Sequence, residues 1–194
     1  IRDLVRSRGL GDVYKRQGGD LVNNVPSDVR MELYVRAKTM EAIDCQHRRV
    51  DEALKAGGAA VGAKTVIETL PGMFPLACSP RLNDLFVENI KEYFPETKIE
   101  DAGHFTASTD MGDISHLMPS IHPFIGGVDG GLHTKDFCVT DFDAAAILPG
   151  KVFAMNIIDL LYDEAAMAKE ILEKEKPILT KEEYLAKLES YFQS

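Results

Sequence analysis

Five histidines are the side chains of this sequence best suited to hold a metal ion or to move a proton at neutral pH. They are His47, His104, His116, His122 and His133. No pair has the HExxH spacing and no two lie four residues apart, so spacing alone does not define a complete metal site. His47 lies beside two arginines in a predicted helix, which is typical of a solvated surface. His104, His116 and His122 flank or occupy a loop-rich segment, where a role at a site and a purely structural role are both open.

His133 differs from the other histidines because a glycine-rich stretch precedes it. Residues 126–131 read GGVDGG and end with Gly130 and Gly131. Glycines let a backbone turn sharply and approach a ligand closely, so a histidine that follows them can be presented to a metal or a substrate. The same composition is also typical of a flexible surface loop, and composition alone leaves both interpretations open.

Two carboxylates, Asp110 and Asp113, lie three residues apart in the sequence STDMGD. At the start of a helix they would share one side, where they could orient a histidine or contact a substrate amine. The serine, threonine and aspartate of this stretch are equally suited to cap the helix, and capping is the interpretation that we favour.

Two polar residues, Asn23 and Arg36, lie at opposite ends of a predicted turn and the strand that follows it. The turn is centred on Pro26, and Arg36 ends the strand. A guanidinium in this position suits bidentate binding of a carboxylate. Taken without other information, a solvated arginine at the end of a strand is the simpler interpretation.

These residues are positioned by predicted strands and helices that alternate in the first half of the chain. Apolar and polar residues alternate over residues 29–35, which predicts a half-buried strand. A helix is expected from Thr39 to about residue 56, where two glycines would end it. Residues 64–69 contain TVIET and predict a second strand, and Ser79 followed by Pro80 predicts a helix that runs to about residue 94. This order is typical of a small α+β domain with helices on one face of an antiparallel sheet.

The second half of the chain begins with a loop-rich segment. Residues 98–131 are rich in Gly, Ser, Thr and Asp, a composition of loops that carry sites. From residue 142 the chain is predicted to be helical, with an interruption at Pro149 and Gly150. Thr180 and Glu183 form a capping box for a last helix that ends near residue 192.

Composition limits the classes of partner. The formal net charge is −9, from 22 basic and 31 acidic residues, which argues against non-specific binding to nucleic acid and against docking on an anionic membrane. No uninterrupted apolar run approaches the roughly 18–20 residues of a spanning helix, so we expect no membrane segment. The three cysteines are widely spaced and form no CxxC pair, so we expect reduced thiols in a cytoplasmic protein.

The first 17 residues fit no predicted element. They read IRDLVRSRGLGDVYKRQ and carry five basic residues. We interpret residues 1–17 as an artefactual or non-native segment and leave them out of the fold prediction. A genuine basic N-terminal arm is the alternative.

Several motifs resemble those of the aminoacylase and glutamate-carboxypeptidase superfamily of metallopeptidases. The sequence NNVPSDVRMELYVRA resembles that superfamily's lid domain, whose motif has an Asn three residues before a Pro and an Arg thirteen residues after the Asn, as Asn23, Pro26 and Arg36 are here. The sequences STDMGDISHLMPSIHPFIG and GGLHTKDF are similar to those of amidohydrolases of the aminobenzoyl-glutamate hydrolase type. The resemblance covers about residues 18–175. It implies a partial α+β lid and dimerisation domain, with a small antiparallel sheet and two helices, over residues 18–97. It implies the C-terminal half of an α/β catalytic domain over residues 98–194.

The resemblance implies a concrete chemistry. Members of the superfamily cleave an amide bond in an N-acyl amino acid or small peptide, with one or two divalent ions, zinc or manganese, and a glutamate as general base. His133 matches their last metal ligand, and Asn23 and Arg36 match lid residues that hold the substrate. Gly130 and Gly131 are expected to contact the substrate, and Asp110 and His116 to lie near the site without an assigned role. A homodimer through the lid is expected.

The chain departs from the superfamily in one large respect. The resemblance places the general-base glutamate, the lid histidine and the remaining metal ligands upstream of Asn23, and none of that region is present. A catalytic zinc needs about three protein ligands, so we expect these 194 residues to be inactive alone. Two alternatives stay open: a general aminoacylase or dipeptidase of the same superfamily, and a non-catalytic module for dimerisation or binding.

Overall fold

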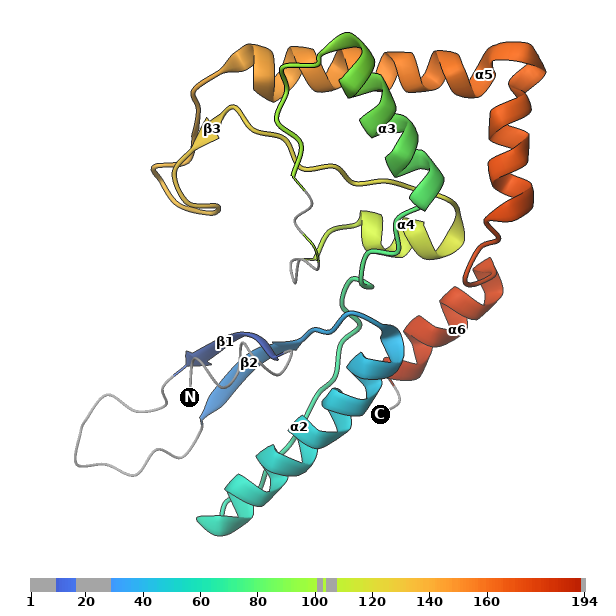
Figure 1. Cartoon of the computed structure of the whole chain (residues 1–194). Coiled ribbons are helices and arrows are strands. Elements are labelled where there is room, and N and C mark those ends of the chain that lie inside the picture. The colour runs from blue at the N-terminus through green and yellow to red at the C-terminus, as the bar shows by residue number, and fades with distance from the viewer. Residues whose placement is uncertain (1–9, 17–28, 101–102, 104–107, 193–194) are drawn as a thin grey trace. The chain divides into compact units, whose positions relative to one another are not determined.

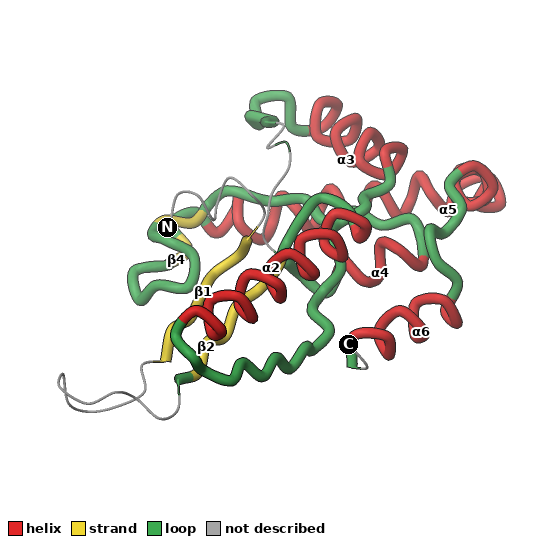
Figure 2. The backbone as a smooth tube through the Cα atoms, turned by 90° about the horizontal axis from the view of Figure 1, so that it is seen from below, coloured by secondary structure: helices red, strands yellow, loops and turns green. Residues whose placement is uncertain are grey.

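The computed structural model describes residues 10–16, 29–100, 103 and 108–192, with side chains from residue 29 onward (Figure 1). The chain divides into two compact units. Unit 1 comprises Ile1–Leu76, Gly103–Gly112 and Glu182–Ser194, and unit 2 comprises Ala77–Ala102 and Asp113–Lys181. Figure 2 shows that helices supply most of the regular structure and that the strands are short.

Unit 1 begins with two antiparallel strands, β1 (Leu10–Arg16) and β2 (Arg30–Val35). Their register pairs Arg16 with Arg30 and Leu10 with Val35, with an irregularity between Leu10 and Val13. The strand predicted over residues 29–35 is therefore confirmed. The segment of residues 1–17 was left out of the predicted fold, yet it supplies β1, and its origin stays a prediction.

The helix α2 (Met40–Ala60) follows β2. Its start is confirmed, because Thr39 is extended and its side chain accepts a hydrogen bond from the backbone of Ala42 at 3.2 Å. The predicted end at Gly57 and Gly58 is wrong, because both glycines lie inside the helix. The helix ends instead at Ala60, and Gly62 follows with a φ of 70°, the left-handed conformation that a glycine adopts without a steric penalty.

Residues 63–76 run back along α2 as an extended segment (Figure 1). Thr65, Ile67 and Thr69 are half-buried, whereas Val66 and Leu70 are exposed, so the side chains alternate as in a strand. The strand predicted over residues 64–69 is nevertheless wrong. Within the described part of the chain this segment pairs with no neighbouring strand, and a strand requires the hydrogen bonds of such a ladder.

Unit 1 also contains most of the last helix, α6 (Lys181–Tyr191). The bounds of α6 confirm the last predicted helix. Phe74, at the end of the extended segment, is buried and packs edge-on against the ring of Tyr184, with ring centroids 5.4 Å apart. An aromatic pair in this arrangement contributes about 0.5–1.5 kcal/mol beyond the area that it buries.

Unit 2 is built on the packing of α3 (Pro80–Tyr93) against α5 (Leu148–Lys174). The start of α3 is confirmed, because Ser79 Oγ accepts from the backbone of Leu82 at 3.0 Å and Pro80 stands at the first helical position. The core between the two helices is formed by Phe86, Ile90 and the fully buried Val152.

The interruption predicted at Pro149 and Gly150 is wrong, because both residues lie inside α5. A π-helical turn, η1 (Asp143–Ile147), directly precedes α5. Its wider turn brings the chain to Pro149 near the start of the α-helix, where the missing N–H of a proline has no partner to lose.

The true break in α5 lies further on. Asp163, Glu164 and Ala165 have φ values of 49°, 55° and 60°, the left-handed region that costs non-glycine residues roughly 1–2 kcal/mol each. Figure 1 shows the helix changing direction there. The first straight part of α5 therefore ends before Tyr162.

One helical span bears on the expectation of no membrane segment, which stays a prediction. The helical span Asp143–Lys174 is long and apolar enough to cross a membrane by length and composition, and 11% of its apolar window is buried. Lys151 and Asp159 interrupt the run, which is why a search for uninterrupted apolar sequence misses it.

The predicted fold class stays a prediction. The described residues form a mixed helix and strand structure with two short antiparallel strand pairs. The units divide near residue 76 rather than near residue 97, because α3 packs on α5. Neither observation tests whether residues 18–97 are a lid and residues 98–194 part of a catalytic domain.

Candidate functional site

The glycine-rich stretch forms the turn of a small hairpin between β3 (Val128–Asp129) and β4 (Cys138–Val139). Gly130 has a φ of 84°, and a Cβ at this position would lie 2.3 Å from the carbonyl oxygen of Asp136. The backbone of Gly131 accepts from both the amide and the hydroxyl of Thr134, at 3.1 and 2.7 Å. The turn is therefore closely folded on itself, and at Gly130 only glycine fits.

His133 lies at the tip of this hairpin. Its φ of 62° is left-handed, and the residue is exposed. Histidine is enriched among the few non-glycine residues that adopt this conformation, and such residues cluster at turns and at sites. The hairpin thus holds the imidazole of His133 outward on a defined turn. This geometry is compatible with a ligand role and does not test it.

Arg36 lies directly after β2 in unit 1. Its guanidinium carbon is 5.1 Å from the centre of the Tyr34 ring, as expected for residues two apart on the same face of a strand. The aromatic ring orients the guanidinium without using its hydrogen-bond donors for another side chain. Arg36 is half-buried, so the simple solvated interpretation is only partly right. Asn23, its predicted companion, lies outside the described residues.

Asp110 lies just before the short helix α4 (Met111–Leu117). The observed cap of α4 is Thr109, whose hydroxyl accepts from the amide of Met111 at 3.3 Å and whose carbonyl accepts from Gly112 at 2.8 Å. The capping interpretation of STDMGD is therefore right for Thr109. Asp110 is exposed in unit 1, and its role near a site stays a prediction.

His116 is a buried residue of unit 2, with 5% of its surface exposed. Its carbonyl accepts from the amide of Leu179 at 2.9 Å, which joins α4 to the segment before α6. The ring of His122 packs edge-on against Phe124, with centroids 5.3 Å apart. The ring contact of His122 is structural, whereas the contact of His116 is made by its backbone and leaves the role of its imidazole a prediction. His104 lies outside the described residues.

The described residues do not fit a metal centre by themselves. Among residues 29–100, 103 and 108–192 there is no group of three or more His, Cys, Asp or Glu side chains that could hold an ion. His133 alone supplies one imidazole, whereas a catalytic zinc needs about three protein ligands. The predicted zinc or manganese therefore stays a prediction whose other ligands must come from outside this set.

Of the predicted site residues, Gly130, Gly131 and His133 are brought together on one hairpin, and His116 belongs to the same unit. Arg36 and Asp110 belong to unit 1. The structure does not place the two units relative to each other, so a site shared by Arg36 and His133 is neither supported nor contradicted.

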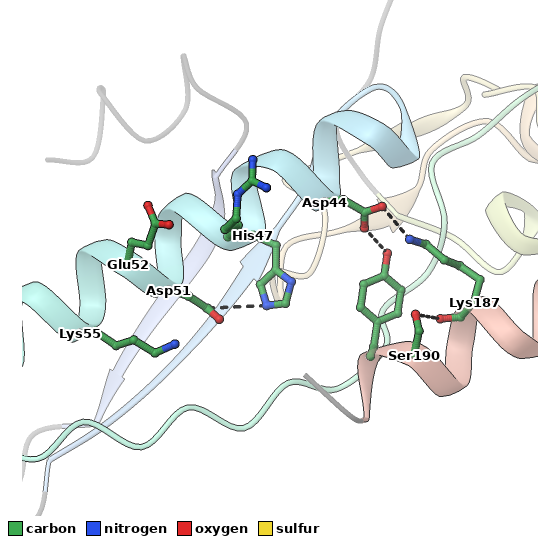
Figure 3. Close-up of a pocket in the computed structure, with 9 residues that line it drawn as sticks. Asp44, His47, Asp51, Glu52, Lys55, Lys187 and Ser190 are labelled. Carbon is green, nitrogen blue, oxygen red and sulfur yellow. Dashed lines mark hydrogen bonds and ion pairs between the residues drawn. The ribbon is translucent and has the colours of Figure 1, made fainter.

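A charged hollow of 380 Å³ in unit 1 was missed by the sequence analysis (Figure 3). It lies between α2 and α6. Asp44 accepts from Lys187 Nζ at 2.6 Å and from the hydroxyl of Tyr191 at 2.7 Å, and the partners are 143 and 147 residues apart in sequence. On the same helix, His47 Nε2 is 3.6 Å from Asp51 Oδ1. Spacing along α2 indicates none of the contacts to α6, which only tertiary packing creates.

The electrostatics of this hollow fit a structural link. Burial raises the pKa of the Asp44 carboxyl, but hydrogen bonds from Lys187 and Tyr191 and the charge of Lys187 outweigh burial and hold that pKa below its usual range. Burial, together with the Asp44 carboxylate, raises the pKa of the Tyr191 phenol. The carboxylate, ammonium and phenol are satisfied by one another, so we assign them no catalytic role.

With this geometry in view, comparison with known proteins indicates a peptidase-like relationship. The chain is 28% identical over 160 residues to Xaa-Arg dipeptidase of Mus musculus, a match that covers 78% of the chain and 37% of that protein. It is 23% identical over 155 residues to Xaa-Arg dipeptidase of Homo sapiens, covering 76% of the chain and 36% of that protein. The chain thus spans little more than a third of the length of these relatives. No family profile matches the chain, and no solved structure matches it.

Proposed function

We propose that this chain is part of a metal-dependent dipeptidase that hydrolyses the amide bond of a dipeptide or N-acyl amino acid. The similarity to two Xaa-Arg dipeptidases over more than three quarters of the chain carries the proposal. This similarity supports a peptidase or dipeptidase in general, and a general aminoacylase or dipeptidase is the alternative to the aminobenzoyl-glutamate type. Hydrolysis by the 194 residues alone is not part of the proposal, because the residues that the structure describes hold no complete metal site.

The hairpin of unit 2 supplies the residues that we propose to act at the reacting end of the substrate. His133 would provide one imidazole ligand to a zinc or manganese ion, and Gly130 and Gly131 would let the backbone approach the substrate. The metal, when bound, would lower the pKa of a water molecule and polarise the scissile carbonyl. The general-base glutamate and the other ligands would come from chain outside these residues.

Arg36 is proposed to bind the carboxylate of the substrate. The guanidinium has five donors in a planar arrangement, and the ring of Tyr34 orients it without engaging those donors. Asn23 is proposed as its companion on the basis of the motif spacing. A homodimer through the predicted lid of residues 18–97 and a cytoplasmic location remain part of the proposal.

Two substrate classes are to be distinguished. The names of the relatives suggest dipeptides that end in arginine, and the motifs STDMGDISHLMPSIHPFIG and GGLHTKDF suggest aminobenzoyl-glutamate. The hairpin and its flanks carry a net negative charge, from Asp129, Asp136, Asp141 and Asp143 against one lysine, Lys135. Their negative charge favours a cationic leaving residue over glutamate. We therefore place the arginine-type dipeptide first.

The test uses the product of this gene extended to the length of the relatives. Release of free amino acid would be measured from dipeptides ending in arginine or lysine and from aminobenzoyl-glutamate, with zinc or manganese added. His133→Ala should lose bound metal and activity together, whereas His47→Ala, a control on α2, should keep both. Arg36→Ala should raise KM by about tenfold or more, because it removes a charge-assisted pair to the substrate.

Two results would count against the proposal. Full metal content and activity in His133→Ala would remove the ligand role of the hairpin. An extended product that is inactive on every dipeptide and N-acyl amino acid tested would favour the non-catalytic binding module instead.

A further inference from the structure

One side of α5 before its break is apolar and uncharged. The residues on it, here called the α5 strip, are Phe153, Ala154, Ile157, Ile158 and Leu161. Phe153, Ile157, Ile158 and Leu161 have exposed fractions of 40, 55, 64 and 63%. At 1.5 Å per residue the α5 strip is about 12 Å long, and no charged side chain lies within it.

The opposite side of the same helix is the one that unit 2 buries, and it carries polar groups beside the buried Val152. Asn89 of α3 donates from Nδ2 to Asn156 Oδ1 and to Asp159 Oδ2, both at 2.8 Å. The buried side of α5 thus combines the apolar core around Val152 with an amide and carboxylate network, whereas the large apolar side chains of the α5 strip lie outside that core. Contiguous exposed apolar surface on this scale marks a surface that something covers.

We infer that the α5 strip is an intramolecular docking surface for the part of the polypeptide that the longer dipeptidase relatives possess and these 194 residues do not. The relatives extend over more than half of their length beyond the match, since the match covers 37% and 36% of them. The occupant would present a continuous apolar face of its own. The inference rests on the relation to these longer proteins and not on the proposed hydrolysis.

A lipid bilayer fits the same helix less well. The buried side of α5 packs on α3, whose outer surface bears Arg81, Asp84 and Glu88, and lipid would have to accept these charges. The left-handed residues that follow Tyr162 also end the straight apolar helix. A polypeptide surface needs to meet only the uncharged strip.

The test compares Ile157→Asp, and the milder Ile157→Ala, in two proteins: the 194-residue chain and the product of its gene extended to the relatives' length. Ile178→Asp is the matched control, because Ile178 is the same residue type, is 58% exposed and lies outside the α5 strip. In the extended product we expect Ile157→Asp to lower Tm by about 5 °C or more and Ile157→Ala by about half as much. Ile178→Asp there, and Ile157→Asp in the 194-residue chain, should shift Tm by less than about 2 °C.

Four results would overturn the inference. A Tm lowered by Ile157→Asp in the 194-residue chain would show that unit 1 covers the α5 strip. A dimer that is seen by light scattering and is abolished by Ile157→Asp but not by Ile178→Asp would show that a second copy of the chain covers the α5 strip. Co-sedimentation with vesicles of phosphatidylcholine and phosphatidylglycerol that is lost only in Ile157→Asp would show that the α5 strip binds a membrane. An unchanged Tm in the extended product would show that the strip stays exposed. If the extended product is inactive but its Tm is still lowered by Ile157→Asp, the docking surface would be supported and the proposed function contradicted.

Discussion

The buried amide of Asn89 offers the sharpest test of how unit 2 is held together. Its Nδ2 donates to Asn156 Oδ1 and to Asp159 Oδ2 at 2.8 Å, and Asn89 and Asn156 are 5% and 4% exposed. Asn89→Ala removes a hydrogen bond to a neutral amide, of about 1 kcal/mol, and one to a carboxylate, of about 1.5–3 kcal/mol. The higher helix propensity of alanine returns about 0.6 kcal/mol. We expect the free energy of unfolding to fall by about 2–3.5 kcal/mol.

The chain contains a matched control on the same helix. Asn83 is exposed on α3, and its removal gives the same gain in helix propensity without any loss of the buried network. Urea unfolding followed by circular dichroism would give the midpoint and slope of each variant. If Asn89→Ala unfolds at the same urea concentration as Asn83→Ala with an unchanged slope, the network contributes no stability and the account of the α3–α5 interface is wrong.

Three further predictions concern unit 1 and the helix ends. Folding lowers the pKa of the Asp44 carboxyl from 3.8, so its contacts with Lys187 and Tyr191 should stabilise the fold above pH 3.8, and this stabilisation should disappear as the pH falls further. Asp44→Asn should flatten this acid dependence of the free energy of unfolding in urea titrations at a series of pH values. An unchanged acid dependence would refute the assignment. Ser79→Ala should cost about 1 kcal/mol through loss of the α3 cap, whereas Ser79→Asp should retain most of it, and equal stability of wild type and Ser79→Ala would contradict the cap. Gly112→Ala should destabilise the chain by at least about 2 kcal/mol, because the new Cβ would lie 1.8 Å from the carbonyl oxygen of Phe74, and a wild-type urea midpoint would show that this close approach is absent.

Features fixed by neighbouring residues were predicted correctly from the sequence. The caps at Thr39 and Ser79 and the alternation of residues 29–35 depend on contacts within a few residues, and each was confirmed. The end of α2 was misplaced by about four residues, because three glycines follow one another closely and the sequence does not show that Gly62, rather than Gly57 or Gly58, adopts the left-handed conformation.

Features that depend on distant partners were not predictable in the same way. Residues 64–69 have the side-chain alternation of a strand, but a ladder also requires a second strand at the right place. The contacts of Asp44 with α6 join residues more than 140 positions apart, and no local pattern indicates them. The candidate site has the same limitation, since Gly130, Gly131 and His133 share a hairpin whereas Arg36 lies in the other unit.

The break in α5 has a consequence for the order in which unit 2 folds. Three successive left-handed residues oppose propagation of a helix, so the segments before Tyr162 and after Ala165 must nucleate separately. Each forms from local contacts on a sub-microsecond to microsecond timescale. The docking of α3 on the first segment must instead close a loop of 67 residues, the separation of Asn89 and Asn156, and this closure costs entropy before any core contact compensates for it. The docking of the helices should therefore limit the folding rate of unit 2. Until docking occurs, both segments of α5 would be helical with their apolar side chains exposed to solvent.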